Sequence, residues 1–185
     1  MIYKTIISID DLKNNLNNDD FLIFDSRCDI KDSGYGIDSY TEGHIPNSIF
    51  VDVDTDLASE KRPGTGRHPL PDPNTFSEKL SHWGMSNNKQ VVVYDDAGGA
   101  FAGRLWWMLK WLGHEAVAVL DGGLNSWVKG GNKLVTTPTV FEKAHFEPCV
   151  QENMIATVED VEEAQFKMNT ILLDARSKER YQGIS

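Results

Sequence analysis

The sequence predicts an α/β protein with a central parallel sheet flanked by helices, followed by the opening of a second unit of the same kind. Short, continuous apolar runs that end in aspartate alternate with segments of helical character. Runs that are apolar on both faces are typical of central strands in parallel sheets. The second unit is indicated by an internal repeat, in which residues 9–27 align without gaps with residues 158–176 at an offset of 149 residues.

The repeat has two anchors. Asp11 lies over Asp160, and residues 22–27 lie over residues 171–176. So long a period indicates tandem domains, because solenoid repeats are only about 20–50 residues long. The second copy reaches only the equivalent of Gly36, so we expect the chemistry of its later part to lie outside this sequence.

The first elements alternate between strand and helix. Ser8 can cap a helix that begins at Ile9, and the helix dipole favours the acids in its first turn. Residues 21–24 and 91–94 are the apolar runs expected to form central strands. Residues 49–54 mix β-branched and acidic residues, as in a less buried strand, and residues 74–80 are expected to be helical after a proline turn.

The later elements continue the pattern. Residues 103–112 are apolar almost all round, which predicts a helix buried against the sheet, and residues 116–120 predict the next strand. A glycine turn then leads into the short segment 124–128. The predicted organisation is a first domain over residues 1–133, an interdomain connection over 134–153 and the start of a second domain over 154–185, with its first helix at about 158–166.

Composition and charge exclude several classes of function. The 185 residues carry a net charge of −10, with a pI near 4.9. A polyanion would be repelled, so we expect neither a nucleic-acid nor an anionic-membrane partner. The sequence has no signal-peptide pattern and no membrane span of about 20 apolar residues, which favours a cytoplasmic protein. Cys28 and Cys149 lack metal-ligand spacing, so we expect two thiols, no metal and no other cofactor.

The loop after the strand at 91–94 is the expected place for chemistry, because ligands bind at the carboxyl ends of parallel strands. Gly98 and Gly99, with the following helix, would let backbone N–H groups converge on an anion or a thiolate. Asp95 and Asp96 stand instead where a nucleophile is expected, and their charge would repel such an anion. We therefore expect them to cap the helix and bond the loop. A carboxylate nucleophile or a metal ligand is the alternative.

Several motifs in order resemble the first domain of the tandem-rhodanese sulfurtransferases. They are Gly43-His44-Ile45-Pro46, the PGTGRHPLP segment at 63–71, the DDAGG loop at 95–99, RLWWML at 104–109 and LDGGLNSW at 120–127. The resemblance covers about residues 7–185. It implies a rhodanese-like fold and a catalytically silent first domain, with Asp95, Asp96, Gly98 and Gly99 as the inactive equivalent of the catalytic loop. It further implies a second domain whose cysteine carries sulfur as a persulfide.

The resemblance also implies substrate-binding residues. Arg180 matches an arginine that binds the sulfur donor, and a guanidinium suits a sulfonate or carboxylate. Asp54 and His68 match residues near the active loop of the second domain in the mercaptopyruvate branch, and Arg67 would help to hold an anionic donor. The plainer interpretations are solvated arginines and a loop histidine with a local hydrogen bond.

Two further interpretations concern charged and thiol groups. Arg27 follows Asp25 as Arg176 follows Asp174, which predicts two structural ion pairs. Cys28 is adjacent to Arg27 but is also flanked by acids, and a reactive thiolate needs a cationic neighbour or a helix N-terminus. The sequence therefore disfavours Cys28 as a nucleophile.

The predicted function is transfer of sulfur from thiosulfate or 3-mercaptopyruvate to cyanide or another thiophile by the full-length protein, with this chain alone inactive. The partners are then a small anionic donor and a thiophilic acceptor. The alternative is a non-catalytic rhodanese module that binds a protein partner or a small anion. Apolar residues of the second unit, such as Val158, Val161 and Leu173, lack a core of their own. We expect them to pack on the first domain, to exchange between chains in a homodimer, or to stay mobile.

Overall fold

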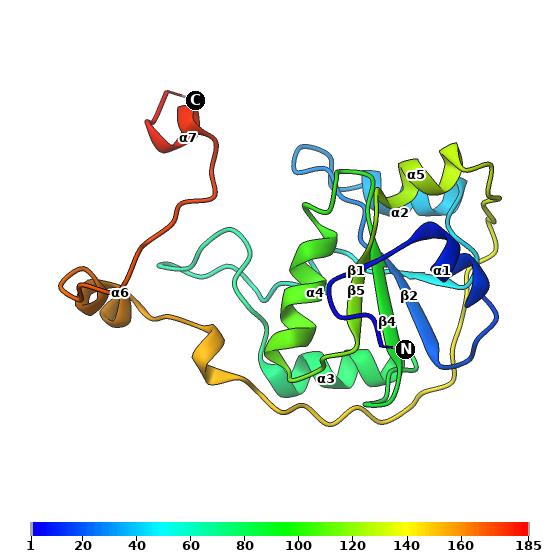
Figure 1. The fold of residues 1–185 in the computed structure, drawn as a ribbon, viewed down its shortest axis with the longest axis horizontal. Coiled ribbons are helices and arrows are strands. Elements are labelled where there is room, and N and C mark those ends of the chain that lie inside the picture. The colour runs from blue at the N-terminus through cyan, green and yellow to red at the C-terminus, as the bar shows by residue number, and fades with distance from the viewer. Residues whose placement is uncertain (1, 185) are drawn as a thin grey trace. The chain divides into compact units, whose positions relative to one another are not determined.

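The computed structural model describes residues 2–184, which form two compact units. The first unit extends to Val150 and the second begins at Gln151. The first unit has a five-stranded sheet with helices on both faces (Figure 1). This arrangement confirms the α/β class predicted from the apolar runs.

The sheet is parallel throughout, with the strand order β1-β5-β4-β2-β3. Parallel neighbours require crossover connections, which the helices supply. β4 lies at the centre, and all five of its residues are buried, which explains the continuous apolar run at 91–94. The strands are β1 (Ile6–Ile7), β2 (Phe21–Asp25), β3 (Ser48–Phe50), β4 (Gln90–Tyr94) and β5 (Val117–Leu120).

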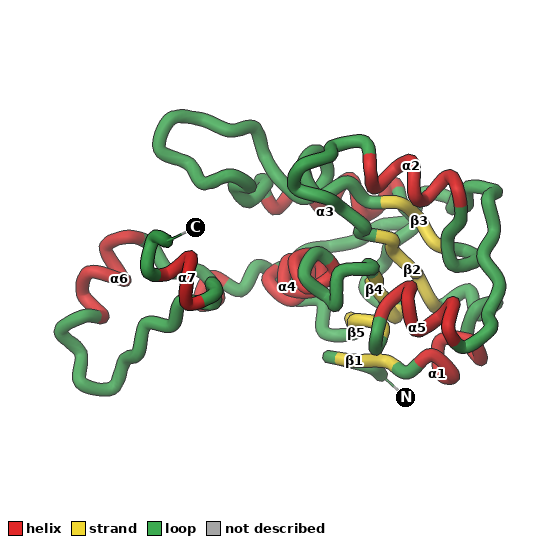
Figure 2. The backbone as a smooth tube through the Cα atoms, turned by 90° about the horizontal axis from the view of Figure 1, so that it is seen from above, coloured by secondary structure: helices red, strands yellow, loops and turns green. Residues whose placement is uncertain are grey.

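Helices cover both faces of the sheet. α1 (Ile9–Asn14) and α5 (Gly123–Lys129) lie over one face, where Leu12 and Trp127 join the apolar core with strand residues. α3 (Pro73–His82) and α4 (Ala102–Trp111) cover the other face (Figure 2). α2 (Tyr35–Glu42) lies beside β3.

The structure differs from the sequence-based expectation near β3 and α2. The strand expected over 49–54 ends at Phe50, because the Asp52 side chain accepts the N–H groups of Asp54 and Thr55 and turns the chain. α2 was not predicted, and it begins after Gly34 without a side-chain cap. β1, which has only two residues, was also not predicted.

The segment after α5 is irregular but packs on the first unit. His44 and Val135 exchange two backbone hydrogen bonds, and the ring of Phe146 is buried. The Cys149 N–H group donates to the carbonyl of Leu112. The packing of the first unit therefore continues well beyond residue 133.

The second unit contains a 3₁₀ turn (Glu152–Met154), α6 (Val158–Ala164) and α7 (Lys178–Tyr181). Thr157 caps α6 through the N–H group of Asp160, as Ser8 caps α1 through that of Asp11. α6 ends before Phe166, the predicted end. Residues 170–174, equivalent to β2, form no strand, because the described part of this unit contains no neighbouring strand to bond with.

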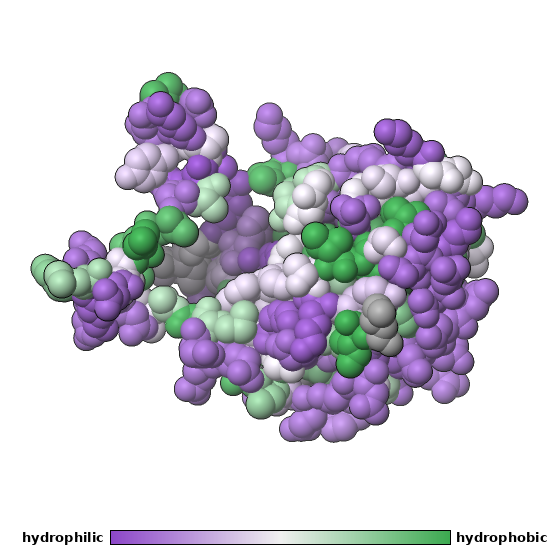
Figure 3. All heavy atoms as spheres, in the orientation of Figure 1, coloured by the Kyte–Doolittle hydropathy of each residue, from purple (hydrophilic) through white to green (hydrophobic). Residues whose placement is uncertain are grey.

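Apolar side chains of the second unit are consequently exposed, as the green spheres of this unit show (Figure 3). The exposed fraction is 71% at Val158, 82% at Ile171 and 89% at Leu173. These residues lack a core within the described chain. None of the helices within residues 2–184 has the length and apolar character needed to cross a membrane.

Candidate functional site

The loop between β4 and α4 closes around the side chain of Asp95. Its carboxylate is fully buried and accepts four backbone hydrogen bonds of 2.8 to 3.0 Å. Gly98 and Gly99 have φ angles of 70° and 90°, which let the loop fold back on the strand end. The four donors are the N–H groups of Ala97, Gly99, Phe101 and Ala102.

This loop is therefore an anion cradle that the protein fills with its own carboxylate. Converging N–H groups at the start of a helix favour negative charge, whether it is a carboxylate, a thiolate or a bound anion. Asp95 thus bonds the loop, as the sequence predicted. Its carboxylate already occupies the four N–H donors of the cradle.

A contact with α5 fixes the backbone of Asp95. The Leu124 N–H group donates to the Asp95 carbonyl at 2.9 Å. A Cβ atom at Gly123 would lie only 2.3 Å from that carbonyl oxygen, and Gly123 has a φ angle of 56°. Glycine is therefore required where α5 approaches the loop.

The expectation that Asp96 also bonds the loop is wrong, because its carboxylate points to another element and does not join the cradle. The Tyr35 hydroxyl of α2 donates to its carboxylate at 2.5 Å, and the Asn125 amide of α5 donates to its carbonyl at 3.0 Å. The hydrogen bond to Asp96 and burial together raise the pKa of Tyr35. Asp96 consequently connects the loop to both helices.

Three of the residues implied as substrate-binding lie together in the first unit. His68 Nε2 is 2.7 Å from Asp54 Oδ1. Asp54 and Arg67 line one surface hollow of about 470 Å³. Arg180, the fourth, lies in α7 of the second unit, where it is exposed.

Cys28 lies close to the same acidic residues. Burial and the charges of Asp54, Asp52 and Asp29 raise the pKa of its thiol to about 11. Because the thiolate is the nucleophilic form, this shift disfavours Cys28 as a nucleophile at neutral pH. The structure therefore supports the interpretation of Cys28 as a non-catalytic thiol. Neither Cys28 nor Cys149 is in a disulfide.

A buried ion pair joins the ends of β2 and β4. Arg27 Nη2 is 2.7 Å from Asp25 Oδ2, and the Tyr94 hydroxyl donates to the same oxygen at 2.7 Å. The Arg27 guanidinium also donates to the Gly43 carbonyl. In the second unit, Arg176 bonds Asp174 with the same set of atoms but in an exposed position. Both predicted ion pairs are present, whereas the role of Tyr94 was missed because it depends on strand pairing.

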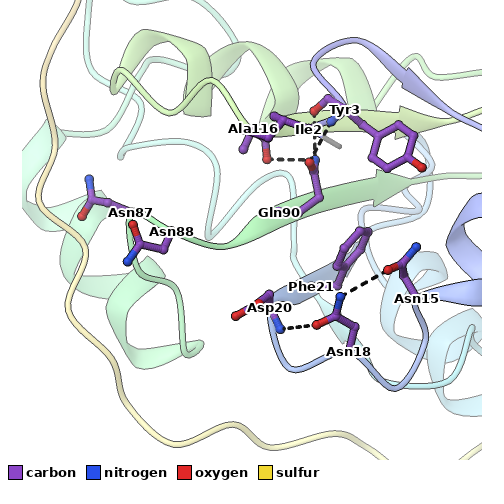
Figure 4. Close-up of a pocket in the computed structure, with 10 residues that line it drawn as sticks. All are labelled: Ile2, Tyr3, Asn15, Asn18, Asp20, Phe21, Asn87, Asn88, Gln90 and Ala116. Atoms are coloured by element: carbon purple, nitrogen blue, oxygen red, sulfur yellow. Dashed lines mark hydrogen bonds between the residues drawn. The ribbon is translucent and has the colours of Figure 1, made fainter.

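Another hollow, of about 490 Å³, lies at the opposite edge of the sheet (Figure 4). Phe21 and Gln90, the first residues of β2 and β4, line it. The amide of Gln90 bonds the backbone of Tyr3 and Ala116, and the Asn18 amide bonds Asn15. These amides are satisfied within the protein, which favours a structural role for this hollow.

Among residues 2–184, no group of three or more His, Cys, Asp or Glu side chains is arranged to hold a metal ion. The acids of the 95–99 loop are engaged with N–H and O–H donors.

A parallel sheet with an anion cradle after its central strand defines the class of this protein. Residues 8–130 match the family model of the rhodanese-like domain, and the chain belongs to that family. Its relatives are sulfurtransferases. It is 37% identical over 180 residues to a probable 3-mercaptopyruvate sulfurtransferase from Pseudomonas aeruginosa, with 96% of this chain and 63% of the relative covered. It is 34% identical over 148 residues to the thiosulfate sulfurtransferase of Rattus norvegicus, with 78% and 48% covered.

Solved structures agree with this assignment. The 3-mercaptopyruvate sulfurtransferase from Leishmania major has a TM-score of 0.83 at 29% identity, with 97% of this chain and 48% of that protein covered. The 3-mercaptopyruvate sulfotransferase SseA from Escherichia coli has a TM-score of 0.83 at 27% identity, with 97% and 68% covered. The chain spans between 48% and 68% of the length of these four proteins.

Proposed function

We propose that the chain is the first part of a two-domain sulfurtransferase. The full protein would move sulfane sulfur from 3-mercaptopyruvate or thiosulfate to cyanide or another thiophile. The observation that carries this proposal is the cradle after β4, which holds the Asp95 carboxylate where persulfide chemistry would need a thiolate. Such a domain is silent. The persulfide cysteine would belong to a second rhodanese domain. Residues 154–185 would form the beginning of that domain.

Substrate handling would divide between the two units. The donors are anions, which suits the guanidinium groups of Arg67 and Arg180. When 3-mercaptopyruvate gives its sulfur to a thiolate, pyruvate leaves as an enolate that must gain a proton. The His68 imidazole, held by Asp54 at 2.7 Å, is suited to supply or relay that proton.

The test compares two proteins in an assay of thiocyanate formation from cyanide with each donor. One is the 185-residue chain, for which we expect no turnover above the uncatalysed reaction. The other is the same chain extended, from the position after Ser185, by the remainder of the Pseudomonas aeruginosa relative. We expect that extension to produce turnover, because it would supply the missing active loop.

A pair of histidine variants of the extended protein tests the role of His68. His68→Asn should lower turnover with 3-mercaptopyruvate by at least about tenfold, the lower part of the range for loss of an acid–base group. His145→Asn is the matched control, because His145 is exposed and pairs with Glu147. Turnover by the 185-residue chain alone would contradict the silent first domain. An unchanged rate in His68→Asn would show that His68 takes no part in the reaction.

The alternative function is a non-catalytic module that binds a protein partner or a small anion. The filled cradle argues against a small anion at the 95–99 loop, whereas the exposed apolar residues of the second unit favour a protein partner. In that case the extended protein would also show no turnover. The net charge of −10 argues against nucleic-acid and anionic-membrane partners, and we propose a cytoplasmic location.

A further inference from the structure

The chain between Leu57 and His68 leaves the body of the first unit as a loop. Residues 60–67 are exposed, whereas Leu57 is fully buried and His68 is half-buried. The two ends of the loop come together at a neck, where the Ser59 N–H group donates to the Pro69 carbonyl at 3.0 Å. His68, which bonds Asp54, stands at this neck.

Arg104 of α4 bonds both sides of the neck. Its Nε and Nη2 atoms donate to the Leu57 carbonyl at 3.0 and 2.6 Å, and Nη2 also donates to the His68 carbonyl at 3.1 Å. A guanidinium can do this because its donors form a rigid planar fork. The ammonium group of a lysine is a single point and would not reproduce the fork.

The charge of Arg104 is held by these carbonyl groups. Burial lowers the pKa of Arg104, and no acidic group contributes to the shift. Placing a half-buried cation against two backbone carbonyls costs desolvation free energy that a neutral side chain would not incur. The hydrogen bonds to Leu57 and His68 offset this cost, and both lie at the neck of the loop.

The two residues of the His68–Asp54 contact are anchored unequally. Asp52 turns the chain at Asp54, and Lys79 donates to the Thr55 carbonyl at 2.8 Å, so the Asp54 side has supports besides Arg104. On the other side, Ser59 holds the carbonyl of the adjacent Pro69, and Arg104 bonds the backbone of His68 itself. Loss of Arg104 should free His68 more than Asp54.

We propose that Arg104 is a positioning residue: its guanidinium closes the neck of the 57–68 loop and thereby holds His68 against Asp54, where the sulfur donor is handled. The catalytic purpose of this role rests on the proposed function. The contacts of Arg104 with the loop do not depend on a bound sulfur donor. Arg104 acts through His68 and does not itself touch the substrate.

Three variants of the 185-residue chain test the proposal. Arg104→Met removes every hydrogen-bond donor of the side chain while keeping a similar length. Arg104→Lys keeps the charge without the planar set of donors of a guanidinium. Lys110→Met is the matched control, because Lys110 lies on the same helix and pairs with Glu115, away from the loop. The readouts are the side-chain ¹⁵N spectrum of His68 and amide hydrogen exchange measured residue by residue.

We expect Arg104→Met to lose the ¹⁵N signature of the His68–Asp54 hydrogen bond. Exchange at residues 59–68 should rise by about tenfold or more, as for the loss of a charge-assisted hydrogen bond, with a smaller rise at residues 52–56. Arg104→Lys should give an intermediate change at His68. Lys110→Met should match the wild type at both places.

Two results would overturn the proposal. One is an unchanged His68 spectrum in both Arg104 variants. The other is a rise in exchange that is equal in β4, β5 and the loop, which would mean a general structural role. If Arg104→Met does not fold, Arg104→Lys decides by the same criteria. These measurements contain no sulfur donor, so they do not depend on the proposed function. If only the proposed function failed, the extended protein would show no turnover while the His68 spectrum still changed in the Arg104 variants.

Discussion

Asp95 determines both the stability of the 95–99 loop and whether its N–H groups are free to bind an anion. A buried carboxylate is costly unless it is fully bonded, and here four N–H groups compensate the cost. The same N–H groups would be left without an acceptor if the carboxylate were removed. The side chain therefore stabilises the loop and at the same time blocks the cradle.

Asp95→Asn should lower the free energy of unfolding by about 2 kcal/mol or more, because an amide offers only one oxygen and leaves N–H groups unpaired, each at about 1–3 kcal/mol. Urea titration measures the change. Asp121→Asn is the matched control, since Asp121 is an exposed aspartate directly after β5. A surface change of that kind should stay within about 0.5 kcal/mol. Equal stability of the two variants would show that the cradle bonds contribute little.

The cradle should also acidify a thiol placed in it. In Asp95→Cys, the converging N–H groups would favour a thiolate, so the pKa of the introduced thiol should fall below about 8.5. Cys28 provides the contrast, because burial and nearby acids raise its pKa to about 11. Ultraviolet absorbance of the thiolate against pH separates the two groups. A variant that titrates only in the range of Cys28 would contradict the cradle as an anion site.

At the scale of elements, the repeat places the same ion pair at the end of β2 and at its equivalent in the second unit. The first pair is buried and shares Tyr94, whereas the second is exposed. Burial makes each partner necessary to the other, because removal of one leaves an uncompensated charge. The two copies are thus matched variants of one interaction in different surroundings.

Arg27→Met should destabilise the first unit by about 3–5 kcal/mol, the usual result of breaking a buried pair. Arg176→Met removes the equivalent side chain from the exposed pair, and it should leave the thermal midpoint of the first unit unchanged. Differential scanning calorimetry of both variants checks this. A loss in Arg27→Met no larger than that in Arg176→Met would contradict a structural role for the buried pair.

At the scale of the molecule, the irregular segment after α5 belongs to the packing of the first unit. A chain ending at residue 150 should therefore unfold at the same temperature as the first unit of the whole chain. A chain ending at residue 133 loses Phe146, which is 2% exposed, and the bonds between His44 and Val135. Its free energy of unfolding should be lower by at least about 3 kcal/mol. Equal stability of the two shortened chains would put the boundary near 133.

The second unit should promote association of the 185-residue chain. Its exposed apolar residues include Ile171 and Leu173, and surfaces of this kind favour contact between copies. Light scattering should give a mass that rises with concentration for the whole chain, while the chain ending at residue 150 stays monomeric. Leu173→Asp is expected to weaken the association. A strict monomer at all concentrations would exclude the homodimer.

Local sequence patterns were enough to predict the central strands and several local contacts of this protein. Apolar runs predicted the central strands, because parallel strands are buried on both faces. The repeat predicted a helix from about residue 158 and the second Asp–Arg pair, and both depend on residues that are close together in the sequence. The aspartate directly after β4 likewise predicted an acid that bonds its own loop.

Tertiary structure decided what depends on residues distant in sequence. The sequence did not predict α2, the order of the strands or the contact of Tyr94 with Asp25, since these arise only when separate segments pair. The acids that raise the pKa of Cys28, and the clamp of Arg104 on the loop neck, likewise come from other elements. Hydrogen bonds and charges act over a few ångströms, so their partners are set by the fold rather than by distance along the chain.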